Sequence, residues 1–287
     1  MTTNKNPGKV VVFDMDETLG YFTQFSYFWE NMKVYFNEHQ NNVKEKQLDD
    51  NFNKILDLYP EYIRPNISSI LKYLKHKVEI NKCQGVMIYT NNNGSKEWIY
   101  HIKDFFEEKI KYKLFNHVIC AFKVDGKQIE MCRTTYEKTV KDFIKCTKLP
   151  ENTQICFLDD LFHPKMNYEN VYYIKLKAYK YDLTFDEIMK RFSNSDIGKK
   201  LLNDQQQEEF HDYMSQIFHS YQNVTKIKEE QDIDKIITKQ TMLYLQNFFY
   251  SKQLETIRKN NGISIPKPVI KSRKTNKNVR NKSLKKE

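Results

Sequence analysis

Three short apolar runs of this sequence each end in side chains that can do chemistry. The side chains are those of Asp14, Asp16 and Thr18, then Thr90, Asn91 and Asn92, and finally Asp159 and Asp160. An apolar run that stops abruptly in such residues is typical of a buried strand whose carboxyl end opens into a site. Because parallel strands end at one edge of their sheet, we expect the three groups to meet in one crevice.

The expected crevice carries four carboxylates, which repel one another unless a cation neutralises them. Neither His nor Cys belongs to the three groups. Oxygen ligands alone favour a hard ion such as Mg²⁺, which binds through a few carboxylates together with substrate phosphate and water. The sequence therefore predicts Mg²⁺ as cofactor, with the ligands drawn from Asp14, Asp16, Asp159 and Asp160.

The segment VVVFDMDETLG, at residues 10–20, resembles the hallmark of the haloacid dehalogenase-like phosphatases, a hydrophobic strand followed by DxDxT. Within that superfamily, the chain is most similar to the phosphatases of the RNA polymerase II C-terminal domain, the NLI-interacting-factor-like group. Their DxDETL signature, an Arg-Pro pair, the second-strand Thr and a late acidic strand end are present as residues 14–19, Arg64-Pro65, Thr90 and CFLDD. The resemblance covers about residues 9–180. The three Asn after Thr90 and the helical text after the first motif depart from the family pattern.

The resemblance implies a mechanism in which Asp14 attacks phosphorus and forms an aspartyl-phosphate. Asp16 would protonate the leaving oxygen and later activate water, and its backbone carbonyl would bind Mg²⁺. Thr18 would hold the loop in place by hydrogen bonding. Thr90, together with Asn91, would donate hydrogen bonds to the phosphoryl oxygens. Of the acids that close the late strand, one or both would hold the metal directly or through water.

The resemblance also implies a lysine that neutralises the charge on the phosphoryl oxygens. Lys138 is the first candidate, because Thr134 and Glu137 have the spacing of a capping box and would place it in the first turn of a helix. Lys141 is the alternative, since the text VKDF resembles the family's lysine segment more literally. Arg133 is a candidate for binding a second anionic group, with a plain surface role as its alternative.

The elements that must position these residues alternate between strand and helix. Apolar runs typical of buried strands occur at 9–13, 85–90, 115–122, 153–160 and 170–176, with helical patterns between them. This order predicts an α/β fold, a doubly wound parallel sheet with a small helical insertion after the first strand and a helical C-terminal extension. The predicted domains are a haloacid dehalogenase-like core over residues 1–183 with its insertion at about 21–62, the helical extension over 184–259, and a basic disordered tail over 260–287.

The charge and the hydropathy of the chain limit the classes of partner that we expect. The net charge of the chain is +10, and most of it lies at the C-terminal end, because residues from 265 onward include nine basic residues and one acidic residue. Such a tail has the composition of a tether to nucleic acid or to an acidic protein, and a solvated tail without function is the alternative. The mean hydropathy of −0.76 predicts no membrane partner. The N-terminal text lacks the apolar stretch of a secretory signal, so we expect an intracellular protein, with cytoplasm, nucleus and virion all open.

Five widely spaced cysteines without a CxxC pair predict reduced, buried thiols rather than disulfides. The function expected from the whole pattern is a Mg²⁺-dependent phosphoric monoester hydrolase. By resemblance, its leading substrate is a phosphoserine/threonine protein. A nucleic-acid-end or small-molecule phosphatase is an alternative that the basic tail and the insertion both permit. A catalytically silent binding module is a second alternative, whose expected mark, loss of Asp14 or Asp16, is not seen.

Overall fold

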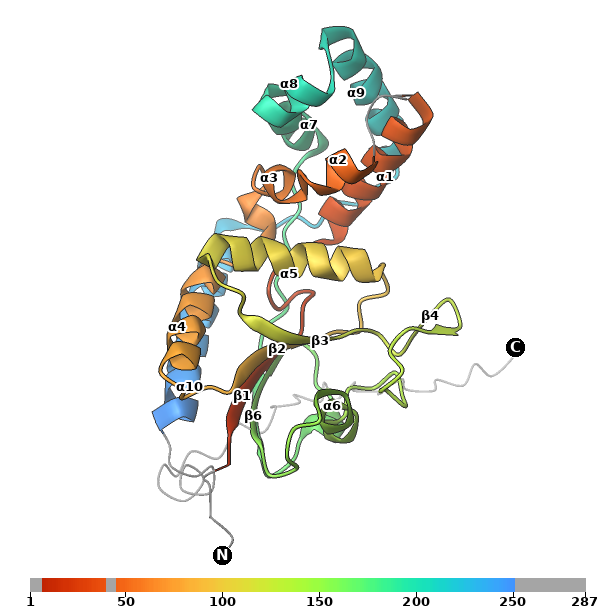
Figure 1. The fold of residues 1–287 in the computed structure, drawn as a ribbon. Helices are drawn as coiled ribbons and strands as arrows, with labels where there is room; N and C mark the ends of the chain where they lie inside the picture. Colours follow the sequence, from red (N-terminus) through yellow and green to blue (C-terminus); the bar gives the residue numbers. More distant parts are fainter. Residues whose placement is uncertain (1–6, 40–44, 251–287) are drawn as a thin grey trace, which may run out of the picture. The chain divides into compact units, whose positions relative to one another are not determined.

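A five-stranded parallel sheet carries the fold, with strand order β3-β2-β1-β6-β7 (Figure 1). Its strands are β1 (Lys9–Phe13), β2 (Gly85–Tyr89), β3 (Phe115–Ile119), β6 (Gln154–Asp159) and β7 (Val171–Lys175). The structure, a computed structural model, describes residues 7–39 and 45–250. β1 lies in the middle and pairs in parallel with β2 on one side and with β6 on the other. Both faces of β2 and β6 are buried, which is why these strands have almost entirely apolar sequences.

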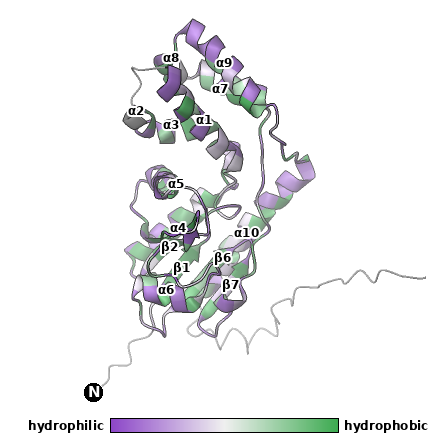
Figure 2. Cartoon of the chain, turned by 90° about the vertical axis from the view of Figure 1, so that its right-hand side faces the viewer, coloured by the Kyte–Doolittle hydropathy of each residue, from purple (hydrophilic) through white to green (hydrophobic). Residues whose placement is uncertain are grey.

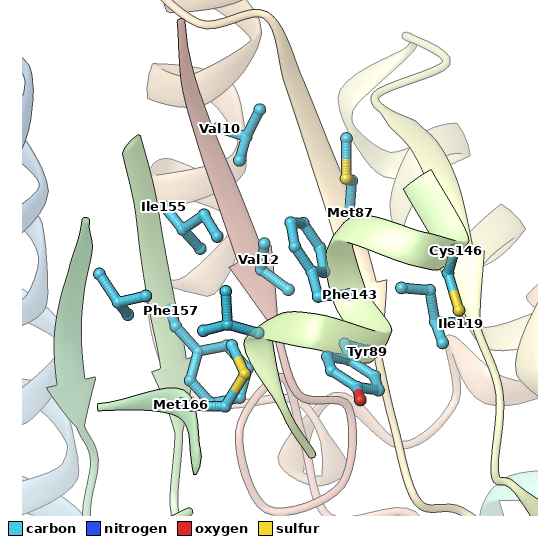
Figure 3. Close-up of a cluster of buried hydrophobic side chains, with 12 residues drawn as sticks. Val10, Val12, Met87, Tyr89, Ile119, Phe143, Cys146, Ile155, Phe157 and Met166 are labelled. Atoms are coloured by element: carbon cyan, nitrogen blue, oxygen red, sulfur yellow. The ribbon is translucent and has the colours of Figure 1, made fainter. Parts of the chain in front are cut away.

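Helices cover both faces of this sheet, which confirms the doubly wound α/β class. They are α4 (Ile67–Glu79), α5 (Lys96–Ile110), α6 (Val140–Thr147) and α10 (Lys228–Tyr250). Figure 1 shows α6 on one side of the sheet and α4 with α10 on the other. On the α6 side, Phe143 packs over Val12 and its neighbours in a buried cluster (Figure 3). Burial of these apolar side chains stabilises the sheet-helix packing beneath the strand ends.

The segment between β1 and α4 is helical, as expected, and comprises α1 (Thr23–His39), α2 (Glu45–Asp49), α3 (Phe52–Leu56) and η1 (Pro60–Tyr62). Of these, α2 and α3 are short helices. Trp29, Phe25, Phe28 and Tyr35 are buried within this part of the chain. They pack within the insertion and also against other parts of the chain, since Phe25 contacts Trp98 of α5, and Phe28 and Tyr35 contact Phe210 of the C-terminal region.

The C-terminal region is also helical, which confirms the expected extension. After β7 come α7 (Phe185–Asn194), α8 (Asp196–Leu201) and α9 (Asp204–Phe218), followed by α10. These helices pack on the insertion, since the Tyr59 hydroxyl donates to the Ile188 carbonyl at 3.0 Å and Phe28 meets Phe192 edge to face. Figure 2 shows α8 and α9 as largely hydrophilic helices, and the apolar side chains that they bury include Ile197, Leu201, Phe210 and Met214.

Residues up to Tyr250 form one compact unit, and the boundary at 183 and 184 stays a prediction. Across residues 7–39 and 45–250, no helix is long and apolar enough to cross a membrane. The predicted disordered tail at 260–287 lies outside the described residues.

One small element was not expected, a hairpin of β4 (Lys123–Val124) and β5 (Lys127–Gln128). Asp125 and Gly126 form its turn with positive φ values of 48° and 77°. An Asp-Gly turn suits a two-residue hairpin because both central residues need positive φ.

The prediction that all thiols are reduced is wrong for two of the five cysteines. Cys132 and Cys146 form a disulfide with their Cα atoms 5.0 Å apart. The chain between them folds back on itself and brings the two together despite their wide sequence spacing. Cys83, Cys120 and Cys156 are free and buried, as predicted.

Candidate active site

The carboxyl ends of β1 and β6 bring three carboxylates into one cluster. Asp14 directly follows β1, whereas Asp159 ends β6 and Asp160 follows it. The Asp14 amide donates to the Leu158 carbonyl at 2.8 Å, which extends the pairing of the two strands into the site. One carboxylate oxygen from each acid lies within 4.8 Å of the others. This donor set of oxygens alone fits a hard divalent cation such as Mg²⁺.

Lys138 lies among these acids with its side chain almost completely buried. Its Nζ donates to Asp14 Oδ1 at 2.5 Å and to Asp159 Oδ2 at 2.7 Å. Although burial lowers the pKa of Lys138, the two carboxylates raise it above its usual value. The lysine therefore stays charged and partly neutralises the cluster.

Lys138 reaches the site from a position that the sequence did not predict. The helix begins at Val140, and its N-cap is Thr139, whose hydroxyl accepts from the Asp142 amide at 2.9 Å. The expected capping box was wrong, because Thr134 instead uses its amide and hydroxyl to hold the Asp142 carboxylate. Lys138 therefore precedes the N-cap rather than lying in the first helical turn.

Lys141, the alternative lysine, is exposed on α6. Its place on the helix separates it from the carboxylate cluster to which Lys138 is bonded. The geometry thus favours Lys138 as the lysine that would face a phosphoryl group.

Asp16 lies beside the cluster and is held by Asn92, to which the sequence assigned no role. Its Oδ2 accepts from Asn92 Nδ2 at 2.8 Å. Asn92 Oδ1 accepts from the Gly94 backbone amide at 2.8 Å, which orients the side-chain amide of Asn92 toward Asp16. Burial and the charge of Asp14 raise the pKa of Asp16 to about 7. A carboxyl with this pKa can both give and take a proton near neutral pH.

Asp159 and Asp160 differ in their electrostatic surroundings. Burial acts to raise the pKa of Asp159, but hydrogen bonds from His163 and Lys138 and the Lys138 charge hold it below its ordinary value. Burial and the charges of Asp14 and Asp159 raise the pKa of Asp160 to about 6. Asp159 is therefore the more strongly ionised of the pair.

Thr90 and its neighbours line the β2 end of the site. Thr90 is fully buried, and its hydroxyl oxygen accepts from the Asn92 amide at 3.0 Å. Asn91 is exposed, and its side-chain oxygen accepts from Arg133 at 2.8 Å. The Thr90 hydroxyl keeps its own proton for donation, and the bond with Arg133 uses only the oxygen of the Asn91 side-chain amide, not its NH2 group.

Arg133 is buried, so the plain surface role is wrong, whereas the binding of a second anionic group stays a prediction. Its guanidinium donates to the carbonyls of Thr90, Cys120 and Tyr136. Those bonds hold the loop after β2 against the segment that leads to Lys138. Five N–H groups in a planar fork suit this task.

The loop that follows Asp14 is held by Arg64, which lies outside the DxDxT motif. The Arg64 guanidinium donates to the carbonyls of Thr18 and Glu17 at 2.6 and 2.5 Å. The Thr18 hydroxyl, which was expected to hold the loop, is buried without a hydrogen-bond partner among the described residues. At Gly20, a Cβ would lie 2.5 Å from the Tyr62 carbonyl oxygen, so a side chain there would displace the backbone.

The sequence did not assign the bonding roles of Asn92 and Arg64, and it predicted no role in the site for His163. His163 Nε2 lies 3.3 Å from Asp159 Oδ2. Its position four residues after Asp159 was the available signal.

A cavity of about 340 Å³ lies away from the carboxylates, between the insertion and the start of α5. Its lining comprises Trp29, Glu30, Lys33, Asp49, Ser95, Glu97, Trp98 and His101. None of the sequence-predicted site residues contributes to it.

Comparison with known proteins adds little to this geometry. No family model matches the chain, and no curated protein matches it. Among solved structures, the chain is similar to YfnB of Bacillus subtilis, which is described as a HAD-hydrolase and was solved with magnesium bound. The identity is 12%, the TM-score is 0.27, and the match covers 59% of this chain and 87% of that chain. A likeness of this degree supports no function by itself.

Proposed function

We propose that this chain is a Mg²⁺-dependent phosphohydrolase that works through an aspartyl-phosphate at Asp14. The observation that carries this proposal is the placement of Lys138 between Asp14 and Asp159, with Asp160 completing the cluster. A buried cation bonded to carboxylates at a strand end suits a site that must accept a charged phosphoryl group.

The residues would act in two steps. In the first, a carboxylate oxygen of Asp14 forms a bond to phosphorus, the bond to the leaving oxygen breaks, and Asp16 gives that oxygen its proton. In the second, Asp16 takes a proton from water, the water oxygen bonds to phosphorus, and the bond to Asp14 breaks. Inorganic phosphate leaves, and both carboxyl groups return to their starting states.

The other residues would hold the phosphoryl group and position the loops. Lys138 would neutralise the charge on the phosphoryl oxygens, and the Thr90 hydroxyl would donate to one of them. Arg133 and Arg64 would keep the two loops in register through backbone carbonyls, without touching substrate.

The carboxylates of Asp14, Asp159 and Asp160, together with the Asp16 backbone carbonyl, would hold the cation. When bound, Mg²⁺ supplies positive charge that screens the acids and the incoming phosphate from each other.

The proposed substrate class is a phosphoserine/threonine protein, on the strength of the motif resemblance. The competing reading as a silent binding module is disfavoured by the presence of both Asp14 and Asp16. A partner bound by the basic tail stays a prediction.

Hydrolysis of p-nitrophenyl phosphate by the full chain tests the proposal. We expect turnover with Mg²⁺, none with EDTA, and none for Asp14→Asn under either condition. Turnover that survives EDTA, or an Asp14→Asn variant as active as the wild type, would exclude the proposed mechanism.

A further inference from the structure

Three large apolar side chains stand exposed next to the catalytic groups. Leu161 and Phe162 follow Asp160 directly and are 60% and 54% exposed. Tyr136 precedes Lys138 by two residues and is 61% exposed. We call these three residues the apolar rim.

Hydrogen bonds and aromatic contacts with neighbouring residues fix the apolar rim. The Leu161 amide donates to Asp159 Oδ1 at 2.8 Å, and its carbonyl accepts from the Tyr173 hydroxyl at 2.8 Å. The Phe162 ring packs on Tyr173 with centroids 5.6 Å apart, and Tyr136 packs edge to face on Phe122 at 5.4 Å. Exposed side chains on so fixed a backbone lose little conformational freedom when a ligand covers them.

An ion pair joins the two segments that carry the rim. Lys165 Nζ lies 2.9 Å from Glu137 Oε2, so the segment before Lys138 is tied to the segment after Asp160. The segment of Tyr136 is therefore linked to the segment of Leu161 and Phe162 across this pair. All three side chains lie on segments that directly flank site residues.

The charges along these segments do not suit a nucleic acid. Within segments 131–137 and 161–168, the Arg133 guanidinium is buried against carbonyls and Lys165 is paired with Glu137. No unpaired Lys or Arg of these two segments is left for a row of phosphates, which dominate affinity for nucleic acids.

We infer that the apolar rim binds apolar side chains that flank the phosphoresidue of a protein substrate. This inference rests on the proposed function and narrows its substrate class to phosphoserine or phosphothreonine in an apolar sequence context. Burial of a leucine side chain against the rim would favour such a segment over a polar one.

Binding to the Asp14→Asn chain tests the inference without turnover. The probes are two fluorescent phosphoserine peptides, one with leucine and one with serine on both sides of the phosphoresidue. We expect the leucine peptide to bind about tenfold more tightly, which is the effect of one well-buried apolar side chain. In a Leu161→Ser/Phe162→Ser chain, the preference should fall below about twofold, and Phe162→Ser alone should give an intermediate value.

A matched control changes two exposed apolar residues of α10, Ile236 and Leu243, to serine. This variant should keep the tenfold preference. Thermal unfolding of every variant confirms that it is folded.

The inference is overturned if the two peptides bind equally, if neither binds, or if the preference survives loss of Leu161 and Phe162. Tighter binding of a 5′-phosphorylated oligonucleotide than of the leucine peptide would also overturn it, in favour of a nucleic-acid substrate. Failure of the proposed function is a separate result, since it appears as absent turnover of p-nitrophenyl phosphate by the wild type.

Discussion

At the scale of single residues, Lys138 offsets the repulsion between the buried carboxylates of Asp14 and Asp159. Two buried carboxylates repel each other strongly, and a cation bonded to both lowers the cost of keeping them ionised. Lys138 Nζ lies within 2.7 Å of an oxygen of each. Its place before the N-cap, rather than on the helix surface, directs the side chain into the site instead of into solvent.

Replacing Lys138 by alanine should lower kcat on p-nitrophenyl phosphate by about 100-fold or more, because the charge on the phosphoryl oxygens loses its fixed partner. Lys141→Ala should stay within about twofold of the wild type, since Lys141 is exposed on α6. Steady-state kinetics of both variants checks this. A large loss in the Lys141 variant with an active Lys138 variant would reverse the assignment.

The carboxylates of the site could be predicted from sequence because each follows an apolar run, and parallel strands end at one edge. The Asn92 contact with Asp16 could not, because any of three adjacent Asn residues could have faced the site. The bonding role of Arg133 could not be predicted either, because its partners are backbone carbonyls from three loops, which no residue pattern encodes.

At the scale of elements, the start of α6 fixes the approach of Lys138. Thr139 caps the helix through the Asp142 amide, and its own amide donates to the Tyr89 hydroxyl at 3.2 Å. Helix and strand β2 therefore share one fixed point next to the site. The Asp142 carboxylate also binds Thr134, so the cap and the preceding segment form one unit.

Thr139→Ala should lower the free energy of unfolding by about 1 kcal/mol, because an orphan amide of the first turn loses its acceptor. Thr139→Ser keeps the hydroxyl and should restore most of this loss. Urea unfolding of the three chains measures the difference. Equal stability of the alanine and wild-type chains would mean that this cap contributes nothing.

Sequence patterns located the strands and most helices, but not this cap. Thr134 with Glu137 and Thr139 with Asp142 have the same spacing, so the spacing alone could not choose between them. The Asp125-Gly126 pair of the hairpin is itself a sequence signal for a two-residue turn.

At the scale of the whole described molecule, the insertion and the C-terminal helices stabilise each other. Arg191 of α7 makes two hydrogen bonds to Glu61 of η1, at 2.7 and 2.8 Å. Burial acts to raise the pKa of Glu61, but the hydrogen bonds and charge of Arg191 hold it below its ordinary value. The residues are 130 positions apart in sequence, so no local pattern could have predicted their contact.

A carboxyl whose pKa is lower in the folded state adds stability above its unfolded pKa and loses it as pH falls through the folded value. Glu61→Gln should therefore lower the free energy of unfolding by about 1 kcal/mol at pH 7. This difference should shrink as the pH falls below about 4. Urea unfolding at several pH values checks it, with Glu30→Gln, from an exposed surface pair, as control. A difference that grows on acidification would contradict the assigned role.

The most direct test of the central claim is to trap the phosphoryl group on Asp14. The Asp16→Asn chain, incubated with Mg²⁺ and p-nitrophenyl phosphate, should form the aspartyl-phosphate, because p-nitrophenolate leaves without a proton, and should fail to hydrolyse it. Acid quenching followed by peptide mass spectrometry should find one phosphoryl group on the peptide containing Asp14. Phosphorylation at another residue, or none in that variant beside an active wild-type chain, would contradict nucleophilic catalysis by Asp14.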